Sequence, residues 1–155
     1  MMRKGTAKLI GPAAQGSKRA LGPGRMVEQS WRVDPWRKFV AMRVREVMKT
    51  EVAFSLQPVL ADFVFYLPRP KLHFRTNGEL KDHAPKYPIG IPDVDKLARA
   101  VMDAATAGSA WDDDSRVVDL HSRKRYATDR NPVGVVIRLS LKEDDDERDQ
   151  GFPEQ

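Results

Sequence analysis

The chain of 155 residues contains no cysteine, which excludes both a disulfide framework and a thiolate metal site. It has no apolar run near the roughly 18 residues that a membrane span needs, so no membrane partner is expected. Its basic N-terminus lacks a continuous apolar stretch, which argues against a secretory signal. We therefore expect a cytoplasmic protein, and the length fits one domain with a real core.

Glutamate is absent from residues 92–120, although this segment holds seven aspartates. They are Asp93, Asp95, Asp103, Asp112, Asp113, Asp114 and Asp119. Mg²⁺ prefers oxygen ligands in octahedral geometry and is usually held by a few carboxylates together with water and phosphate. The pair Asp93 and Asp95, backed by the cluster at 112–114, therefore suggests a divalent cation.

The net charge of +5 hides an asymmetry along the chain. Residues 1–141 hold 25 basic and 15 acidic side chains, whereas residues 142–155 hold two basic and seven acidic ones. A basic body attracts polyanions such as nucleic acid, although many basic proteins are merely soluble. The composition predicts a folded domain over residues 1–141 and an acidic, disordered tail over residues 142–155.

Hydrophobic periodicity predicts an α/β (α+β) domain with the order β-β-α-β-α-β-β, a mixed sheet of about four to five strands covered by two main helices. Strands are expected at 7–10, 25–28, 59–67, 116–126 and 133–141, with the first two paired as a hairpin around a Gly- and Pro-containing loop. Helices are expected at about 35–50 and 93–106. Asp34 and Pro35 offer an N-cap and a first helical residue for the first helix.

Residues 68–92 hold five prolines and two glycines and are expected to form a long loop. The loop is basic, and either a clamp on a phosphate backbone or a solvated excursion would fit its composition. The candidate DNA-binding residues are Arg69, Lys71, Arg75 and Lys86 in this loop, with Lys18 and Arg19 near the N-terminus.

Asp93 and Asp95 stand at a loop-to-helix boundary, where carboxylates also serve as ordinary helix caps. Asp114 stands where the next strand begins, so we expect it to fold back beside them. Three converging carboxylates would be costly without a cation, which favours a metal site. Arg99 lies one turn beyond Asp95 and would either stabilise charge on a phosphate or form a salt bridge along the helix.

The segments Pro92-Asp93-Val94-Asp95-Lys96-Leu97-Ala98-Arg99-Ala100-Val101-Met102-Asp103-Ala104 and Trp111-Asp112-Asp113-Asp114-Ser115-Arg116-Val117-Val118 resemble the RusA family of Holliday junction resolvases. The resemblance extends over roughly residues 7–141. It implies a Mg²⁺-dependent, dimeric endodeoxyribonuclease of a bacterial cell or a phage, with Mn²⁺ as an alternative ion, that resolves four-way DNA junctions by paired incisions. By motif position, Asp93, Asp95 and Asp114 match the metal-binding aspartates.

Two positions depart from the family pattern. Arg99 stands where the family often has a catalytic lysine, and Lys96 stands where it often has asparagine. Because arginine keeps its proton, Arg99 would stabilise charge only, or Lys96 would reach the phosphate in its place. Both residues are therefore candidate catalytic residues.

A C₂ homodimer would supply the two sites that paired incisions need. Two other interpretations compete with the junction resolvase. The first is a non-catalytic DNA-binding module whose aspartates are structural caps, which a metal-dependent nuclease assay would distinguish. The second is another enzyme with a D-x-D motif, such as a nucleotide-sugar transferase, but the chain is short for that class and has no Gly-rich phosphate loop.

Overall fold

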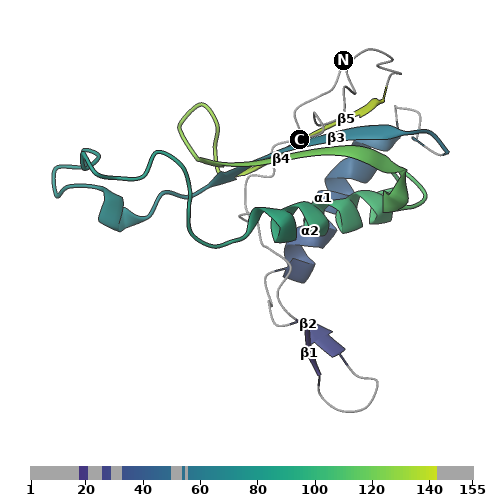
Figure 1. Cartoon of the computed structure of the whole chain (residues 1–155), viewed down its shortest axis with the longest axis horizontal. Coiled ribbons are helices and arrows are strands. Elements are labelled where there is room, and N and C mark those ends of the chain that lie inside the picture. The colour runs from purple at the N-terminus through teal and green to yellow at the C-terminus, as the bar shows by residue number, and fades with distance from the viewer. Residues whose placement is uncertain (1–17, 21–25, 29–32, 50–53, 55, 143–155) are drawn as a thin grey trace, which may run out of the picture.

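The structure, a computed structural model, describes residues 18–20, 26–28, 33–49, 54 and 56–142. Its helices and strands follow the predicted order (Figure 1): β1 (Lys18–Ala20), β2 (Met26–Glu28), α1 (Val33–Met48), β3 (Val59–Leu67), α2 (Val94–Ala107), β4 (Val117–Tyr126) and β5 (Gly134–Leu141). Two short 3₁₀ turns interrupt the connections, η1 (Lys71–His73) and η2 (Asp114–Arg116). The described part of the chain is a single α+β domain.

The main sheet has the order β4-β3-β5, with β3 parallel to β4 and antiparallel to β5. The prediction of a mixed sheet under two helices is confirmed, but the count of four to five strands is wrong, because this sheet has three. β1 and β2 pair only with each other among the described residues, in a separate hairpin with Lys18 opposite Glu28. The expected strand at 7–10 lies outside the described residues, and the partner of β2 comes instead from a stretch predicted as loop.

Both helices cover the same face of the sheet (Figure 1). In a strand, alternate side chains point to opposite faces, and the odd-numbered residues of β3 point toward the helices. These residues form the centre of the core and are 0–5% exposed: Val59, Ala61, Phe63, Phe65 and Leu67. Trp36 of α1 is fully buried and its ring centroid lies 6.5 Å from that of Phe65.

The apolar stripes of both helices face the core as predicted from their helical spacing. Trp36, Val40 and Val44 are buried on α1, and Leu97 and Val101 are buried on α2. Asp34, however, lies inside the first turn of α1 rather than before it, since the helix begins at Val33.

At its C-terminal end α2 approaches α1 closely. A Cβ atom at Gly108, the C-cap of α2, would lie 2.8 Å from the carbonyl oxygen of Ala41. An ion pair of 3.2 Å between Arg37 and Asp103 also joins the two helices.

No helix in the described ranges is long and apolar enough to cross a membrane.

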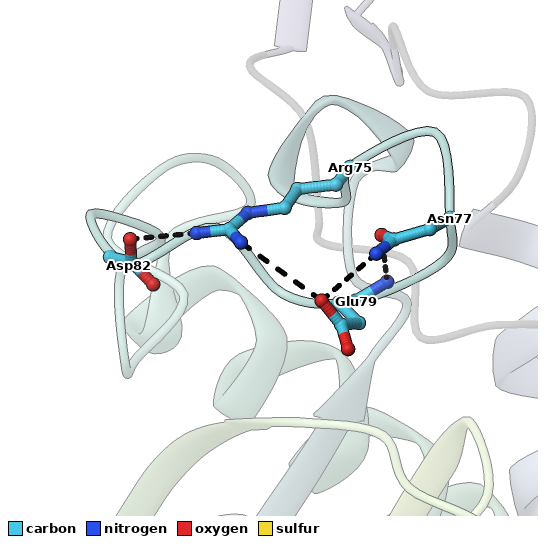
Figure 2. A network of polar contacts seen from close by, with 4 residues as sticks. All are labelled: Arg75, Asn77, Glu79 and Asp82. Carbon is cyan, nitrogen blue, oxygen red and sulfur yellow. Dashed lines mark hydrogen bonds and ion pairs between the residues drawn. The ribbon is translucent and has the colours of Figure 1, made fainter.

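The predicted loop at 68–92 leaves the end of β3 and projects away from the sheet before it reaches α2 (Figure 1). A single isolated bridge joins Phe74 to Leu80 within it. Figure 2 shows how polar contacts close its outer part: Arg75 donates to Asp82 at 2.7 Å and lies 4.0 Å from Glu79, which also accepts a bond from Asn77. The loop therefore has internal structure of its own.

Candidate active site at the start of helix α2

Asp93 and Asp95 lie where the 68–92 loop enters α2. Asp93 holds the N-cap position with extended backbone angles (φ −69°, ψ 141°), yet its side chain makes no capping hydrogen bond. It points instead to Lys96, whose ammonium lies 2.8 Å from its carboxylate. Asp95 is exposed and its side chain makes no hydrogen bond or ion pair with any described residue. The interpretation of Asp93 as an ordinary side-chain cap therefore has no support in its hydrogen bonding.

Lys96 and Asp93 shift each other's pKa at the start of α2. Its hydrogen bond and its positive charge lower the pKa of Asp93, with a smaller contribution from Lys124. In return, the hydrogen bond and charge of Asp93 raise the pKa of Lys96. Both groups are consequently ionised at neutral pH, and Asp93 is ready to bind a cation or to keep Lys96 in place.

Lys124 is a functional candidate that the sequence pattern did not single out. It belongs to β4, opposite Phe65 on the helix-facing side of the sheet. Its ammonium donates to the carbonyl oxygens of Gly90 at 2.8 Å and Pro92 at 2.9 Å, directly before Asp93. The available signal was a lysine at a core-facing position of a strand, where an apolar residue would be expected.

Arg99 stays apart from the carboxylates of its own helix. Asp103, one of its two possible partners at i±4, is paired with Arg37 of α1. Within the described part of the chain, Arg99 forms no ion pair or hydrogen bond with Asp95 either, although both side chains are exposed. The alternative of a salt bridge along the helix is thus not formed, and the guanidinium is left available to a ligand.

The cluster at 112–114 separates into two structural carboxylates and one free one. Asp112 binds Arg116 through two hydrogen bonds of 2.9 and 2.8 Å, which hold the pKa of Asp112 down at about 2. Asp113 accepts a bond of 2.8 Å from the backbone nitrogen of Ser115 and caps η2. The side chain of Asp114 is exposed and has no partner among the described residues.

Asp114 does not fold back beside Asp93 within one chain. Because β3 and β4 are parallel, α2 must run back along the sheet, so that its N-terminus meets the end of β4 and its C-terminus meets the start (Figure 1). Lys124 lies near the end of β4 that meets the start of α2, and Val117, three residues after Asp114, is the first residue of β4. These two strand residues are about 23 Å apart at about 3.3 Å per residue.

A metal ion can therefore not be held by Asp93, Asp95 and Asp114 of the same chain. Across the described ranges no group of three or more Asp, Glu, His or Cys side chains is arranged to hold a metal ion.

The cations of the 68–92 loop fall into two kinds. Arg69 stacks 3.8 Å from the ring centre of Tyr126 and donates to the carbonyl oxygen of Pro85, and Arg75 is paired as described above. Lys71 is exposed with no side-chain partner among the described residues, and the Lys86 ammonium lies 5.6 Å from the ring centre of Tyr87. For Lys18 and Arg19 the structure describes the backbone of β1 alone.

A family model described as endodeoxyribonuclease RusA matches residues 11–140, which is most of the chain. The chain belongs to the RusA family. The match includes both aspartate-rich segments and the connecting helix, so the RusA resemblance of these motifs is confirmed. The family consists of endodeoxyribonucleases that act on branched DNA and in general depend on a divalent metal. No curated protein sequence matches the chain significantly.

Proposed function

We propose that this RusA-family chain is a Mg²⁺-dependent endodeoxyribonuclease that resolves four-way DNA junctions by paired phosphodiester hydrolysis. The observation that carries the proposal is the family match over both aspartate segments, combined with exposed side chains at Asp95, Arg99 and Asp114 that have no partner among the described residues. A binding module with purely structural aspartates would be expected to use these carboxylates as caps or salt bridges. Asp112 and Asp113 are used in that way, whereas Asp95 and Asp114 are not.

We propose the residue roles from their positions. Asp93 and Asp95 supply oxygen ligands at the start of α2, and Arg99, one turn further along, stabilises negative charge on the phosphate. Lys96 holds Asp93 in the free protein and would have to exchange that contact for a cation or a phosphate. The ammonium of Lys96 is therefore either a placeholder for a cation or a second phosphate contact.

A C₂ homodimer would bring Asp114 of one chain close to Asp93 and Asp95 of the other. A two-fold axis that relates two copies of β4 in opposite directions places the start of each strand beside the end of the other. Asp114 of the partner subunit would then approach Asp93 and Asp95, and each dimer would contain two such sites. The same symmetry suits a four-way junction, which must be cut on two strands. A DNA substrate would place this work in the cytoplasm of a bacterium or of a phage-infected host.

Mixing two inactive variants tests the activity and the shared site together. We expect Asp95→Asn and Asp114→Asn each to abolish Mg²⁺-dependent cleavage of a synthetic four-way junction while leaving junction binding largely intact. If each site takes Asp95 from one chain and Asp114 from the other, a mixed dimer keeps one intact site and nicks the junction. If both aspartates act within one chain, no mixed dimer is active.

The controls separate the possible failures. Asp112→Asn should cleave at close to the wild-type rate, because Asp112 is occupied by Arg116. A wild-type protein that binds junctions but never cuts them, with Mg²⁺ or Mn²⁺, would support the non-catalytic binding module. Active wild type with inactive mixtures would retain the nuclease and reject the shared site.

A further inference from the structure

The face of the main sheet that points away from α1 and α2 carries an unusual arrangement of charge. The even-numbered residues of β3 point to this face, and Asp62 is the acidic one among them. Its carboxylate is bound by Arg123 of β4 and, at 3.2 Å, by Arg138 of β5. One aspartate of the central strand thus gathers an arginine from each neighbouring strand.

Strand register explains why the three groups meet. Arg138 is directly opposite Asp62 in the antiparallel pair, and Arg123 is opposite Val64, one diagonal step from Asp62. Such neighbours on one face lie within reach of long side chains. The convergence is therefore built into the pairing of β3 with both edges and does not depend on loop geometry.

The arginine side chains are more exposed than the aspartate that they bind, which favours binding of an anion from solvent. The side chain of Asp62 is 17% exposed, whereas those of Arg123 and Arg138 are 45% and 46% exposed. Each guanidinium has five N–H donors, and each is bonded to Asp62 through one nitrogen. The carboxylate is less exposed than the two cations that it binds, and one negative charge cannot neutralise both.

The surroundings extend this positive surface toward the candidate active site. Arg125, two residues beyond Arg123 on the same face, lies 4.9 Å from the ring centre of Tyr87 in the 68–92 loop. Lys124, between the two arginines in sequence, points to the opposite face of the sheet. Its ammonium donates to the carbonyl oxygen of Pro92, the residue before Asp93. A DNA backbone that passes over Arg123 and Arg125 would thus follow β4 toward the end of the strand where α2 begins.

We propose that the helix-free face of the sheet is a contact surface for the DNA phosphate backbone, in which Arg123 and Arg138, held by Asp62, bind one phosphodiester group. Arginine suits this task because its planar fork matches phosphate oxygens and stays charged. The inference rests on the proposed function for its ligand and adds a DNA surface separate from the 68–92 loop. In the free protein Asp62 lies between the two guanidinium groups, and its negative charge opposes an incoming phosphate.

The test measures binding of a short labelled DNA duplex by the 155-residue chain between about 0.05 and 0.2 M salt. Changing both arginines to methionine keeps the apolar stems and removes the charges. We expect weaker binding and a log–log salt slope shallower by about 0.9 for each phosphate that the variant no longer neutralises. The matched control is Arg43→Met, because Arg43 of α1 is 44% exposed and also paired with a carboxylate, Glu46. It should keep the wild-type slope.

Asp62→Asn separates the anion site from a merely structural ion cluster. It removes the single negative charge under the arginines, so an anion site should bind DNA as tightly as wild type or more tightly, even if the melting temperature falls. A loss of DNA affinity in Asp62→Asn, measured on folded protein, would overturn the proposal. So would a wild-type slope in the folded double methionine variant.

The failures of the two proposals give different results. If wild type cuts junctions while the double methionine variant binds duplex with an unchanged slope, the nuclease stands and this surface is rejected. If wild type binds no DNA at any of these salt concentrations, both proposals are rejected. If the double methionine variant does not fold, the variant with Arg123→Lys and Arg138→Lys provides the comparison. Lysine keeps the charge but cannot bind a phosphate in a bidentate way, so DNA affinity should fall while the salt slope stays almost unchanged. Unchanged affinity would count against a bidentate site.

Discussion

The ammonium of Lys124 donates a hydrogen bond of 2.9 Å to the carbonyl oxygen of Pro92, the residue that precedes Asp93. Together with its bond to Gly90, this contact attaches the end of the 68–92 loop to β4. Lys124 also helps to lower the pKa of Asp93, after the larger effect of Lys96. The sheet therefore determines where the first carboxylate of the candidate site stands.

We predict that Lys124→Met lowers the single-turnover cleavage rate by more than tenfold while junction affinity changes little, because the carboxylate is displaced without loss of a phosphate contact. The carboxyl pKa of Asp93, followed by NMR, should rise. Lys124→Arg should restore part of both quantities, since it keeps the charge. Arg130→Met, at an exposed position without a partner among the described residues, is the control. An unchanged Asp93 pKa in Lys124→Met would contradict the electrostatic role.

Arg99 and Lys96 should differ in their kinetic roles. Arg99 is unpaired among the described residues, so Arg99→Ala should lower the cleavage rate much more than the binding affinity, as expected for a group that acts in the transition state. Lys96→Ala frees Asp93 from its ion pair and should have a milder effect on rate. Single-turnover cleavage of a junction at saturating protein ranks the two variants, and the reverse order would assign the catalytic position to Lys96.

The Asp112–Arg116 pair should behave as a structural contact. Its effect is a pKa of about 2 for Asp112, below the usual value of 3.8. Because the folded pKa is depressed, the pair stabilises the fold above about pH 3.8, and this contribution is lost as the pH falls through about 2. We predict that Arg116→Gln moves the NMR-measured pKa of Asp112 back toward 3.8. A pKa that stays near 2 would show that another donor holds the carboxylate.

Gly108→Ala should destabilise the contact between the helices. The added Cβ would lie 2.8 Å from a backbone oxygen and from Val44 of α1, so the helices must separate. Overpacking of this kind costs about 1–3 kcal/mol in the free energy of unfolding. Gly90→Ala is the control, since no atom lies within 4 Å of the position of its added Cβ. Equal urea midpoints for the two variants would show that α1 yields without cost.

The elements with strong local patterns were predictable from the sequence. β3 has the predicted bounds because a run rich in apolar, β-branched and aromatic residues is flanked by prolines, and the helices follow from their apolar stripes. The three-residue strands β1 and β2 carry too little pattern to identify partners, which explains the error in strand count. Short, polar strands depend on pairing that spacing alone does not determine.

The arrangement of the candidate site could not be predicted from the sequence, and the roles of its residues stay a prediction. The aspartate motifs and the RusA resemblance predict Asp93, Asp95 and Asp114 as metal ligands, but the crossover between parallel strands places the two ends of α2 at opposite ends of the sheet. Lys124 was missed because its partners are backbone carbonyls, which have no sequence signature. The structure was also needed to show which carboxylates form salt bridges. The pairing of Arg37 with Asp103 and of Arg116 with Asp112 depends on their positions in the fold.

The cations of the 68–92 loop should separate into DNA contacts and loop supports. Replacing all four, Arg69, Lys71, Arg75 and Lys86, with alanine should weaken DNA binding and flatten its salt dependence, but the two pairs should act differently. Lys71→Ala with Lys86→Ala should reduce the log–log slope by about 0.9 for each phosphate no longer neutralised and leave the melting temperature unchanged. Arg69→Ala with Arg75→Ala removes the bonds to Pro85 and Asp82, so amide exchange in the loop should speed up while the slope changes less. An unchanged slope in the lysine pair would make the loop a solvated excursion and leave DNA binding to the sheet face and the N-terminal basic residues.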